Sequence, residues 1–301
     1  DIRVLMGTND GLMHMFRNTN ADGTQSGVES WAFMPRSALP ILKTLKENSA
    51  STPPHPYGSD GELTLYTHDA NNDGTLDHNA GDKVYAFFGM RRGGQHIYAL
   101  DISNPDQPQQ LWHISGGSGD FAELAMSFST PRPITVQYGG TATKALIFGG
   151  GYNGGWNNGG TRVGKDASSA ADTPNKGNAI FIVNLETGAL IWKAAYDSIE
   201  SASDTVYHHP DLVDSIASEV AVLDSNGDSI EDRAYVGDTG GSVWRIDFPA
   251  ATGSDNRASQ WQIVKLADLD QQTETITADD DDGSSTQVVD VDRRFFHRPD
   301  I

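Results

Sequence analysis

Apolar and polar residues alternate along short segments of the chain, and turns that contain glycine separate these segments. Alternation with a period of two places successive side chains on opposite faces of a β-strand. Pairs of such segments recur four times, at residues 3–7 and 11–16, 83–89 and 94–101, 144–149 and 177–184, and 233–237 and 241–247. The recurrence predicts antiparallel β-hairpins arranged as a repeat architecture.

A tryptophan follows each hairpin in the context of a further strand. These residues are Trp31, Trp112, Trp192 and Trp261, which are 81, 80 and 69 residues apart. The first hairpin lacks the leading strand that precedes the other three, at residues 62–66, 133–137 and 219–223. Four antiparallel strands per repeat are typical of the blades of a β-propeller. We interpret the repeated glycines and tryptophans as turn and packing residues.

The predicted fold class is therefore all-β, with one β-propeller domain fragment over residues 1–301. Its approximate blades are residues 1–58, 59–118, 119–200 and 201–290, and residues 291–301 begin a further blade with a strand at 294–297. The clear helix candidate, residues 37–48, is an insertion in the first repeat. Because the chain opens on a segment that already has strand character, we expect it to begin inside a longer protein whose export signal lies upstream.

Charge and composition exclude several classes of partner. Lys and Arg number 21 against 41 Asp and Glu, which gives a formal net charge of −20. Such a surface cannot neutralise phosphates, so we expect neither nucleic acid nor an anionic membrane as a partner. The absence of cysteine excludes disulfides and thiolate chemistry. No apolar stretch reaches the roughly 18 residues of a membrane span, so none is predicted.

The first candidate site is the acidic loop at residues 69–77, Asp-Ala-Asn-Asn-Asp-Gly-Thr-Leu-Asp. Its oxygen-bearing side chains stand at positions 1, 3, 5 and 9 and its glycine at position 6, as in the first part of an EF-hand loop. The predicted Ca²⁺ ligands are the side chains of Asp69, Asn71, Asp73 and Asp77 and the carbonyl of Thr75. Alternating acids in a tight loop converge the oxygens that a hard cation requires.

The second candidate site, at residues 224–232, repeats this spacing. Its predicted Ca²⁺ ligands are Asp224, Asn226, Asp228, Asp232 and the carbonyl of Ile230. Here position 6 is Ser229 and the glycine stands at position 4, so we expect a slightly different turn. Both loops fall between the first and second strands of their repeats, which makes chance duplication a poor explanation.

Neither loop has the glutamate that an EF-hand places at position 12, because Ala80 and Tyr235 occupy those positions. A water molecule or a neighbour such as Asp82 would have to complete the coordination shell. The alternative interpretation of each loop is an acidic β-turn without metal. A third acidic run, at residues 279–282, has four adjacent acids that cannot all point inward, so we interpret it as a solvated loop.

Several other motifs do not carry the chemistry that they suggest. Residues 149–154 match a dinucleotide fingerprint, but the glycine-rich stretch that follows cannot form the required helix. Residues 159–165 have phosphate-loop spacing, yet Asp166 replaces the magnesium-binding Ser or Thr. His208 and His209 with Asp211, or His96 with Asp101, lack a convergent third group, so we interpret them as strand or surface residues.

Four segments together resemble the C-terminal propeller of the PilC/PilY type IV pilus biogenesis factors and tip adhesins. They are residues 8–16, 31–35, 93–101 and 235–247, within a similarity over residues 2–301. The most specific signature is the loop at 224–232 followed directly by 235–247. The resemblance implies Ca²⁺ ligation by the second loop, whereas the assignment of the first loop rests on its spacing alone.

The resemblance also implies a location at the cell surface or pilus tip, reached through the periplasm and associated with the outer membrane. Implied partners are type IV pilus components such as minor pilins, and a host or surface receptor. Implied roles are pilus assembly, calcium-dependent opposition to retraction, twitching motility and adhesion. Some family members bind integrin through Arg-Gly-Asp, a tripeptide that this sequence lacks.

Two other functions are compatible with the same repeats. The pattern that ends at Asp101 and the four tryptophans also resemble quinoprotein dehydrogenase propellers. Those enzymes require a full ring of blades, and many use a vicinal cysteine pair that this chain cannot supply. The other alternative is a calcium-stabilised surface adhesin unrelated to pili. We expect a protein that is not an enzyme.

Overall fold

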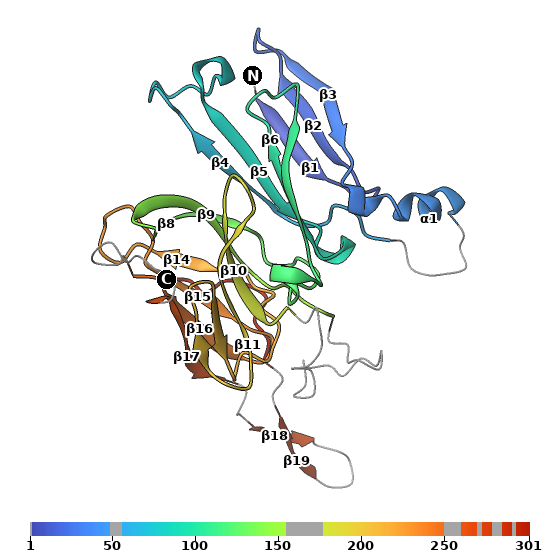
Figure 1. Ribbon diagram of the computed structural model, residues 1–301. Coiled ribbons are helices and arrows are strands. Elements are labelled where there is room, and N and C mark those ends of the chain that lie inside the picture. Colours follow the sequence, from blue (N-terminus) through green and yellow to red (C-terminus); the bar gives the residue numbers. More distant parts are fainter. Residues whose placement is uncertain are drawn as a thin grey trace.

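The first sheet is small and carries the one α-helix of the described residues. We analysed a computed structural model, which describes residues 2–48, 56–154, 177–249, 260–269, 273–278, 285–290 and 293–301. Three antiparallel strands form this sheet in the order β1-β2-β3: β1 (Arg3–Gly7), β2 (Met13–Thr19) and β3 (Gln25–Phe33). They precede the 3₁₀ turn η1 (Arg36–Ala38) and the helix α1 (Ile41–Glu47). No leading strand pairs with β1 among the described residues, as the sequence predicts (Figure 1).

The second sheet is a complete four-stranded blade. Its strands lie in sequence order: β4 (Leu63–His68), β5 (Lys83–Gly89), β6 (His96–Asp101) and β7 (Gln109–Ser115). Two 3₁₀ turns lie in its connections, η2 (His78–Ala80) before β5 and η3 (Arg91–Gly93) before β6. A further 3₁₀ turn, η4 (Gly119–Phe121), leads from this sheet to the next. The predicted leading strand at 62–66 is thus confirmed as β4.

The third sheet contains the same four-stranded unit and two additional strands. The unit comprises β8 (Arg132–Tyr138), β9 (Thr141–Gly149), β10 (Ala179–Asn184) and β11 (Leu190–Tyr196). The short strands β12 (Ser201–Ala202) and β13 (Val206–His209) extend it, and β13 pairs with β11 in parallel. The sheet therefore continues past residue 200, the boundary that the repeat pattern predicts.

The fourth sheet again has four strands in sequence order. They are β14 (Ala221–Leu223), β15 (Arg233–Gly237), β16 (Ser242–Asp247) and β17 (Gln262–Asp268). A separate hairpin of β18 (Thr273–Ala278) and β19 (Ser285–Asp290) projects from the body (Figure 1). The described residues 293–301 contain no strand, so the strand predicted at 294–297 is wrong.

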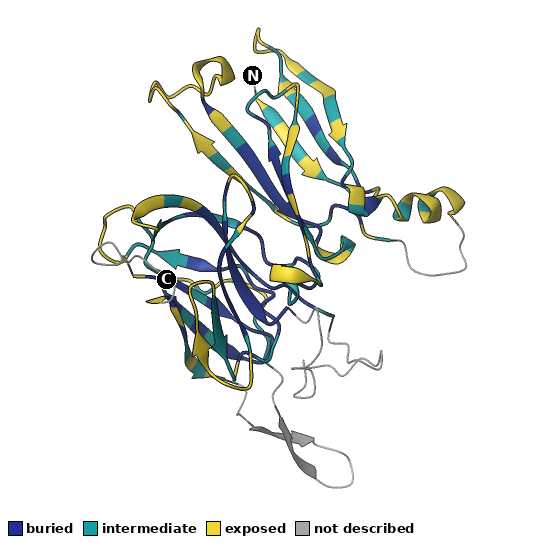
Figure 2. Cartoon of the chain, viewed as in Figure 1, coloured by how far each residue is buried: buried dark blue, intermediate teal, exposed yellow. Residues whose placement is uncertain are grey.

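The core lies between successive sheets, as the faces of propeller blades require. One apolar cluster joins the first and second sheets, another the second and third, and a third the third and fourth. Figure 2 shows buried residues along the strands of the second to fourth sheets, where these clusters meet. The predicted role of the tryptophans is visible in this packing. The indole Nε1 of Trp31 donates to the carbonyl of Pro105 at 2.9 Å, and that of Trp112 to the carbonyl of Leu185 at 3.0 Å.

The strands β1, β5, β9 and β15 each end in a glycine, because another segment of the chain lies directly against that position. A Cβ atom on Gly7, Gly89 or Gly149 would lie only 2.2, 2.6 or 2.4 Å from the carbonyl oxygen of Ser59, Ser127 or Ile216, respectively. Gly237 meets Phe295 in the same way, with the Phe295 Cβ at 2.5 Å. These positions exclude any side chain without movement of the neighbouring segment.

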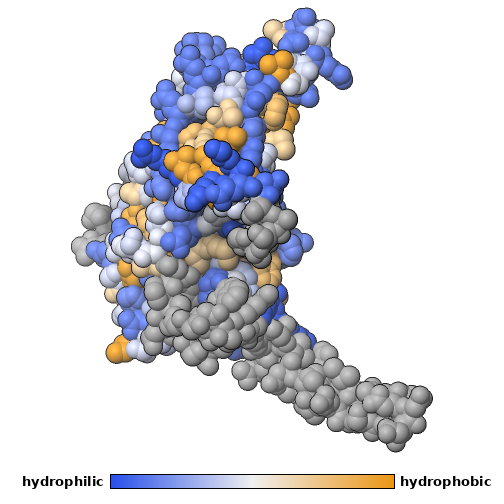
Figure 3. Space-filling model, turned by 90° about the vertical axis from the view of Figure 1, so that its right-hand side faces the viewer, coloured by the Kyte–Doolittle hydropathy of each residue, from blue (hydrophilic) through white to orange (hydrophobic). Residues whose placement is uncertain are grey.

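Helix α1 is confirmed within the predicted insertion at 37–48. It begins after Pro40 and ends at Asn48, whose left-handed φ of 38° stops the helix. Ile41 packs against the core between the first two sheets, whereas Leu39 and Leu42 are exposed. Figure 3 shows the side of the molecule on which α1 projects, with apolar patches on a mainly hydrophilic surface. Among the described residues no helix is long and apolar enough to cross a membrane.

Candidate metal site: two acidic loops

Both acidic loops join the first strand of a sheet to the second strand. The loop at 69–77 follows β4 and precedes β5, and the loop at 224–232 lies between β14 and β15. The predicted equivalence of their positions is therefore confirmed. In each loop the aspartate at position 1 is half-buried, and positions 2 to 6 are exposed.

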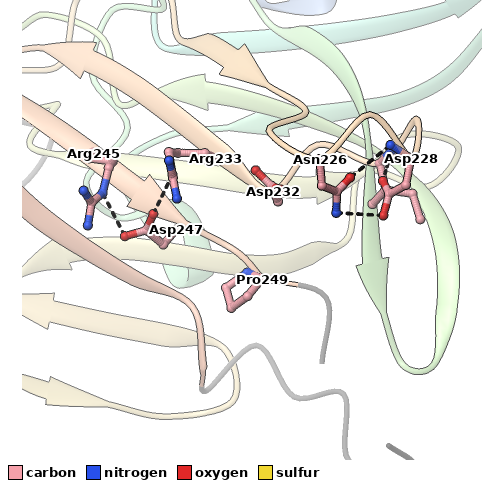
Figure 4. A pocket seen from close by; sticks show the side chains of 8 residues that line it. Asn226, Asp228, Asp232, Arg233, Arg245, Asp247 and Pro249 are labelled. Atoms are coloured by element: carbon pink, nitrogen blue, oxygen red, sulfur yellow. Dashed lines mark hydrogen bonds and ion pairs between the residues drawn. The ribbon is translucent and has the colours of Figure 1, made fainter. Parts of the chain in front are cut away.

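In the second loop, Asp224 organises the backbone. Its Oδ1 accepts N–H groups from Gly227 at 2.7 Å and Asp228 at 3.2 Å, and its Oδ2 accepts the N–H of Ser229 at 2.7 Å. The Oδ1 of Asn226 accepts the N–H of Asp228 at 3.0 Å, and the amide of Asn226 donates to Oδ2 of Asp228 (Figure 4). The turn is thus held by its own polar side chains.

The first loop repeats most of this pattern. Asp69 accepts the N–H groups of Asp73 at 3.3 Å and Gly74 at 2.8 Å. The Oδ1 of Asn71 accepts the N–H of Asp73 at 3.0 Å, and its amide donates to Oδ2 of Asp73. In both loops the residue at position 7 donates its N–H to the aspartate at position 5, Thr75 at 2.7 Å and Ile230 at 2.9 Å. The two loops therefore share one frame.

The backbone conformations also agree, contrary to our expectation of different turns. Position 4 is left-handed in both loops, with φ of 56° at Asn72 and 79° at Gly227. Position 6 is left-handed as well, with φ of 80° at Gly74 and 67° at Ser229. The loops differ only in which of these two positions is glycine. Asn72 occupies position 4 of the first loop, and asparagine tolerates the left-handed region. Ser229 occupies position 6 of the second loop, where its N–H donates to Asp224.

The residue that closes each loop was only partly evident from spacing. In the second loop Asp232 accepts the N–H of position 2, Ser225, at 3.3 Å, and its hydroxyl at 2.7 Å. In the first loop the residue that accepts the N–H of position 2, Ala70, is Asp82, at 2.8 Å. Asp82 and Asp232 both directly precede the second strand of their sheets. Asp82 is therefore the structural counterpart of Asp232.

Asp77, the position 9 residue of the first loop, has a different role. Its Oδ1 accepts the N–H of Asn79 at 2.9 Å and thereby caps the 3₁₀ turn η2. Its own N–H donates to Oδ2 of Asp82 at 2.8 Å. Five additional residues thus separate position 9 from the start of β5, and the buried carboxylate of Asp82 takes the closing position.

Hydrogen bonds keep the key carboxylates in the charged form. The N–H groups of Asp77 and Ala70 hold the pKa of Asp82 below its ordinary value. Burial by itself raises the pKa of Asp224, but four backbone N–H groups of the loop outweigh it, so this pKa also lies below its ordinary value. Both groups are therefore anionic at neutral pH and can act as ligands of a cation.

The second loop borders a surface hollow that also contains basic residues. Asp247 accepts from Nε of Arg233 at 3.1 Å and from Nε of Arg245 at 2.9 Å, beside Asn226 and Asp228 (Figure 4). Glu231 connects the loop to the third sheet, because its carboxylate accepts the N–H of Thr135 at 2.7 Å. The loop is thereby fixed to two sheets.

The donor atoms fit a hard cation, although the described residues do not form a closed metal cage. In that part of the chain no three His, Cys, Asp or Glu side chains converge as metal ligands. The loops instead offer two or three carboxylates, an asparagine amide and backbone carbonyls, all of them oxygen donors. This donor set suits Ca²⁺ and does not suit metals that prefer nitrogen or sulfur.

The other sequence motifs occupy separate places. Asp101 accepts the N–H of Ser103 at 2.8 Å, and His96 instead meets His113. His208 contacts Ser201, whereas His209 packs against Trp244. Three segments lie outside the described residues: the glycine-rich stretch after 149–154, the rejected phosphate loop at 159–165, and the acidic run at 279–282.

Comparison with known proteins identifies the family of this propeller. The family model described as the PilY1 beta-propeller domain matches residues 1–266. The chain belongs to this family. The type IV pilus biogenesis factor PilY1 of Pseudomonas aeruginosa (strain UCBPP-PA14) is 28% identical over 270 residues, which cover 89% of this chain and 19% of that protein. A PilY1 homolog of Xylella fastidiosa (strain Temecula1) is 28% identical over 266 residues, or 87% of this chain and 15% of that protein.

A solved structure agrees with the fold of a PilY1 propeller. The crystal structure of the Pseudomonas aeruginosa PilY1 C-terminal domain matches with a TM-score of 0.54 and 23% sequence identity, over 96% of this chain and 48% of that chain. Both curated relatives are named as pilus biogenesis factors and not as enzymes. The chain spans less than a fifth of the length of either relative.

The structure assigns a role to Asp238 within the PilY1-like signature at 235–247. Asp238 is fully buried in the turn between β15 and β16. It accepts the N–H groups of Gly240 at 2.9 Å and Ser242 at 2.8 Å, and the indole N–H of Trp244 at 2.7 Å. The aspartate six residues before a tryptophan was visible in the sequence, but its burial was not.

Proposed function

We propose that this chain is the calcium-binding β-propeller of a type IV pilus biogenesis factor, located at the cell surface or pilus tip. There it promotes pilus assembly, twitching motility and adhesion. Membership of the PilY1 family and the names of its curated relatives support the role in pilus biogenesis. The shared hydrogen-bond frame of two acidic loops at equivalent blade positions is the observation that supports calcium binding.

The second loop would bind Ca²⁺ through the side chains of Asp224, Asn226, Asp228 and Asp232 and the carbonyl of Ile230. The first loop would use Asp69, Asn71, Asp73, the carbonyl of Thr75, and Asp82 in place of Asp77. Water molecules would complete the six to eight oxygens that Ca²⁺ takes. The carboxylates repel one another without a cation, so each ion would relieve repulsion in a chain of formal charge −20.

Calcium in the Asp224 loop would order one edge of the propeller. This loop leads directly into β15, and Glu231 connects it to Thr135 of β8 in the third sheet. An ordered edge would then be the surface that pilus components such as minor pilins recognise. In adhesion, this propeller would bind a host or surface receptor, which is a partner distinct from the pilus components.

Asp82 should contribute more to calcium binding by the first loop than Asp77. We expect Asp82→Asn to weaken that site at least about tenfold, because the variant replaces an anionic carboxylate by a neutral amide and leaves one oxygen in place of the two that accept from Ala70 and Asp77. Asp77→Asn should have a smaller effect, since Asp77 caps η2. Calorimetric titration of each variant, made with the second loop disabled by Asp224→Ala, measures the first site alone. A larger effect of Asp77→Asn would contradict the assignment.

The pilus role is tested in the bacterium that carries the gene. We expect chromosomal Asp224→Ala with Asp232→Ala to reduce the number of surface pili and the width of twitching zones. Asp22→Ala serves as a matched control, because Asp22 contacts only Thr24 of its own turn by hydrogen bonds that the structure describes. Normal piliation and twitching in the double variant, with export unchanged, would contradict the proposal.

A further inference from the structure

Two neighbouring strands of the second sheet bring two histidine side chains together. His96 on β6 and His113 on β7 are 17 residues apart, and the Nδ1 of His96 lies 3.1 Å from the Nε2 of His113. The hydroxyl of Ser115, which pairs with His96 across the two strands, lies 3.2 Å from the same Nδ1. The Nδ1 of His96 therefore has two further donor atoms, His113 Nε2 and the Ser115 hydroxyl, within 3.2 Å of it.

The neighbouring rings hold this arrangement in place. Tyr98 stacks on His113 with ring centroids 4.3 Å apart and an angle of 13° between the planes. The hydroxyl of Tyr98 is fixed by Ser37, to which it donates at 3.0 Å and from whose N–H it accepts at 3.2 Å. Phe88 also stacks on Tyr98, with ring centroids 5.6 Å apart. The His113 ring is thus oriented by a buried and hydrogen-bonded tyrosine.

The contact between the two imidazoles matches the requirements of a metal ion. Two neutral imidazoles at this distance share one proton between two nitrogen atoms. A tetrahedral metal with metal–nitrogen distances of about 2.0–2.1 Å separates its ligand nitrogens by about 3.4 Å. The pair needs to open by only a few tenths of an ångström.

We propose that His96 Nδ1, His113 Nε2 and the Ser115 hydroxyl form a surface site for a divalent transition-metal ion, Zn²⁺ or Cu²⁺, distinct from the acidic loops. Imidazole nitrogen suits these ions and does not suit Ca²⁺. Water would occupy the remaining positions. The site lies at the end of the sheet where β6 begins, whereas the acidic loop at 69–77 lies at the opposite end, where β5 begins.

The adjacent histidines of β13 show why the register matters. His208 and His209 are neighbours in sequence, but successive side chains of a strand point to opposite faces. The Nδ1 of His208 meets Ser201 at 3.1 Å, and the His209 ring meets Trp244 at a centroid distance of 5.0 Å. His208 therefore has a serine neighbour like that of His96 but no imidazole contact among the residues that the structure describes, which makes it a matched control.

Titration of the full chain with ZnCl₂, in the presence of saturating CaCl₂, tests the proposal by calorimetry. We expect one zinc site per chain, weakened at least about tenfold by His96→Gln or His113→Gln and unchanged by His208→Gln. Electron paramagnetic resonance of the Cu²⁺ complex should show coupling to two imidazole nitrogens in the wild type. Retention of zinc affinity in both His96→Gln and His113→Gln, or a copper spectrum without paired nitrogen coupling, would overturn it. The melting temperatures of the variants confirm that they are folded.

Discussion

Replacing Asp238 by alanine is expected to lower the free energy of unfolding by about 3–5 kcal/mol. The carboxylate is fully buried and accepts three hydrogen bonds, from the N–H groups of Gly240 and Ser242 and from the indole of Trp244. Alanine would leave all three donors without an acceptor in the interior. Urea unfolding followed by tryptophan fluorescence measures the loss.

Two further variants make this expectation specific. Asp238→Asn keeps one oxygen for the backbone N–H groups but places an amide N–H₂ where the other oxygen now accepts from Trp244, so its loss should be intermediate. Asp10→Ala removes an exposed aspartate that accepts the N–H of Leu12 in the corresponding hairpin turn of the first sheet, and it should cost about 1 kcal/mol or less. Equal losses for Asp238→Ala and Asp10→Ala would contradict the assigned role.

The protonation of Asp238 should also make the stability of the protein depend on pH. Burial raises the pKa of Asp238 above its ordinary value, although the hydrogen bond from Trp244 and the backbone N–H groups oppose this effect. A raised pKa in the folded protein means that the charged form costs stability. The wild type should therefore lose this part of its stability as the pH rises from the ordinary aspartate value through the raised pKa. The Asp238→Asn variant should lack that loss.

Calcium should produce the second large effect. At a free concentration one hundred times the dissociation constant, each occupied loop should add about 2.7 kcal/mol to the free energy of unfolding, because the ion binds the folded state alone. Two independent loops should therefore add about 5 kcal/mol. Urea unfolding in CaCl₂ and in EDTA measures the difference, and Asp224→Ala should remove about half of it.

Magnesium provides the control for this effect. Mg²⁺ requires shorter, nearly octahedral coordination and gives up its water reluctantly, so at equal concentration it should stabilise the chain less than Ca²⁺. An unfolding midpoint that is the same in CaCl₂, MgCl₂ and EDTA would show that the loops are acidic turns without a bound ion.

The repeat pattern predicted most of the fold because strand alternation and glycine turns are local properties of the sequence. The four hairpins, three leading strands and α1 were all found where the pattern placed them. The strands β12 and β13 were not predicted, since a two-residue strand and a parallel partner leave no local pattern. The prediction of a strand at 294–297 was wrong. Phe295 lies against Gly237, but no strand among the described residues pairs with this segment.

The candidate sites divide in the same way. Spacing predicted that the two loops begin at Asp69 and Asp224 and occupy equivalent positions, but it did not show that these carboxylates accept the backbone N–H groups of their loops. It could not show that Asp82 replaces Asp77 at the closing position, because η2 intervenes between them. The contact of His96 with His113 depends on strand register, and a β-bulge between Ala99 and Leu100 shifts this register. Such contacts exist only after the strands pair.

Calorimetric titration with Ca²⁺ counts the ions that the chain binds. We expect two ions per wild-type chain, one each for Asp224→Ala and for Asp69→Ala, and none for the double variant. Absence of calcium binding by the wild type, or two ions retained by the double variant, would contradict this expectation.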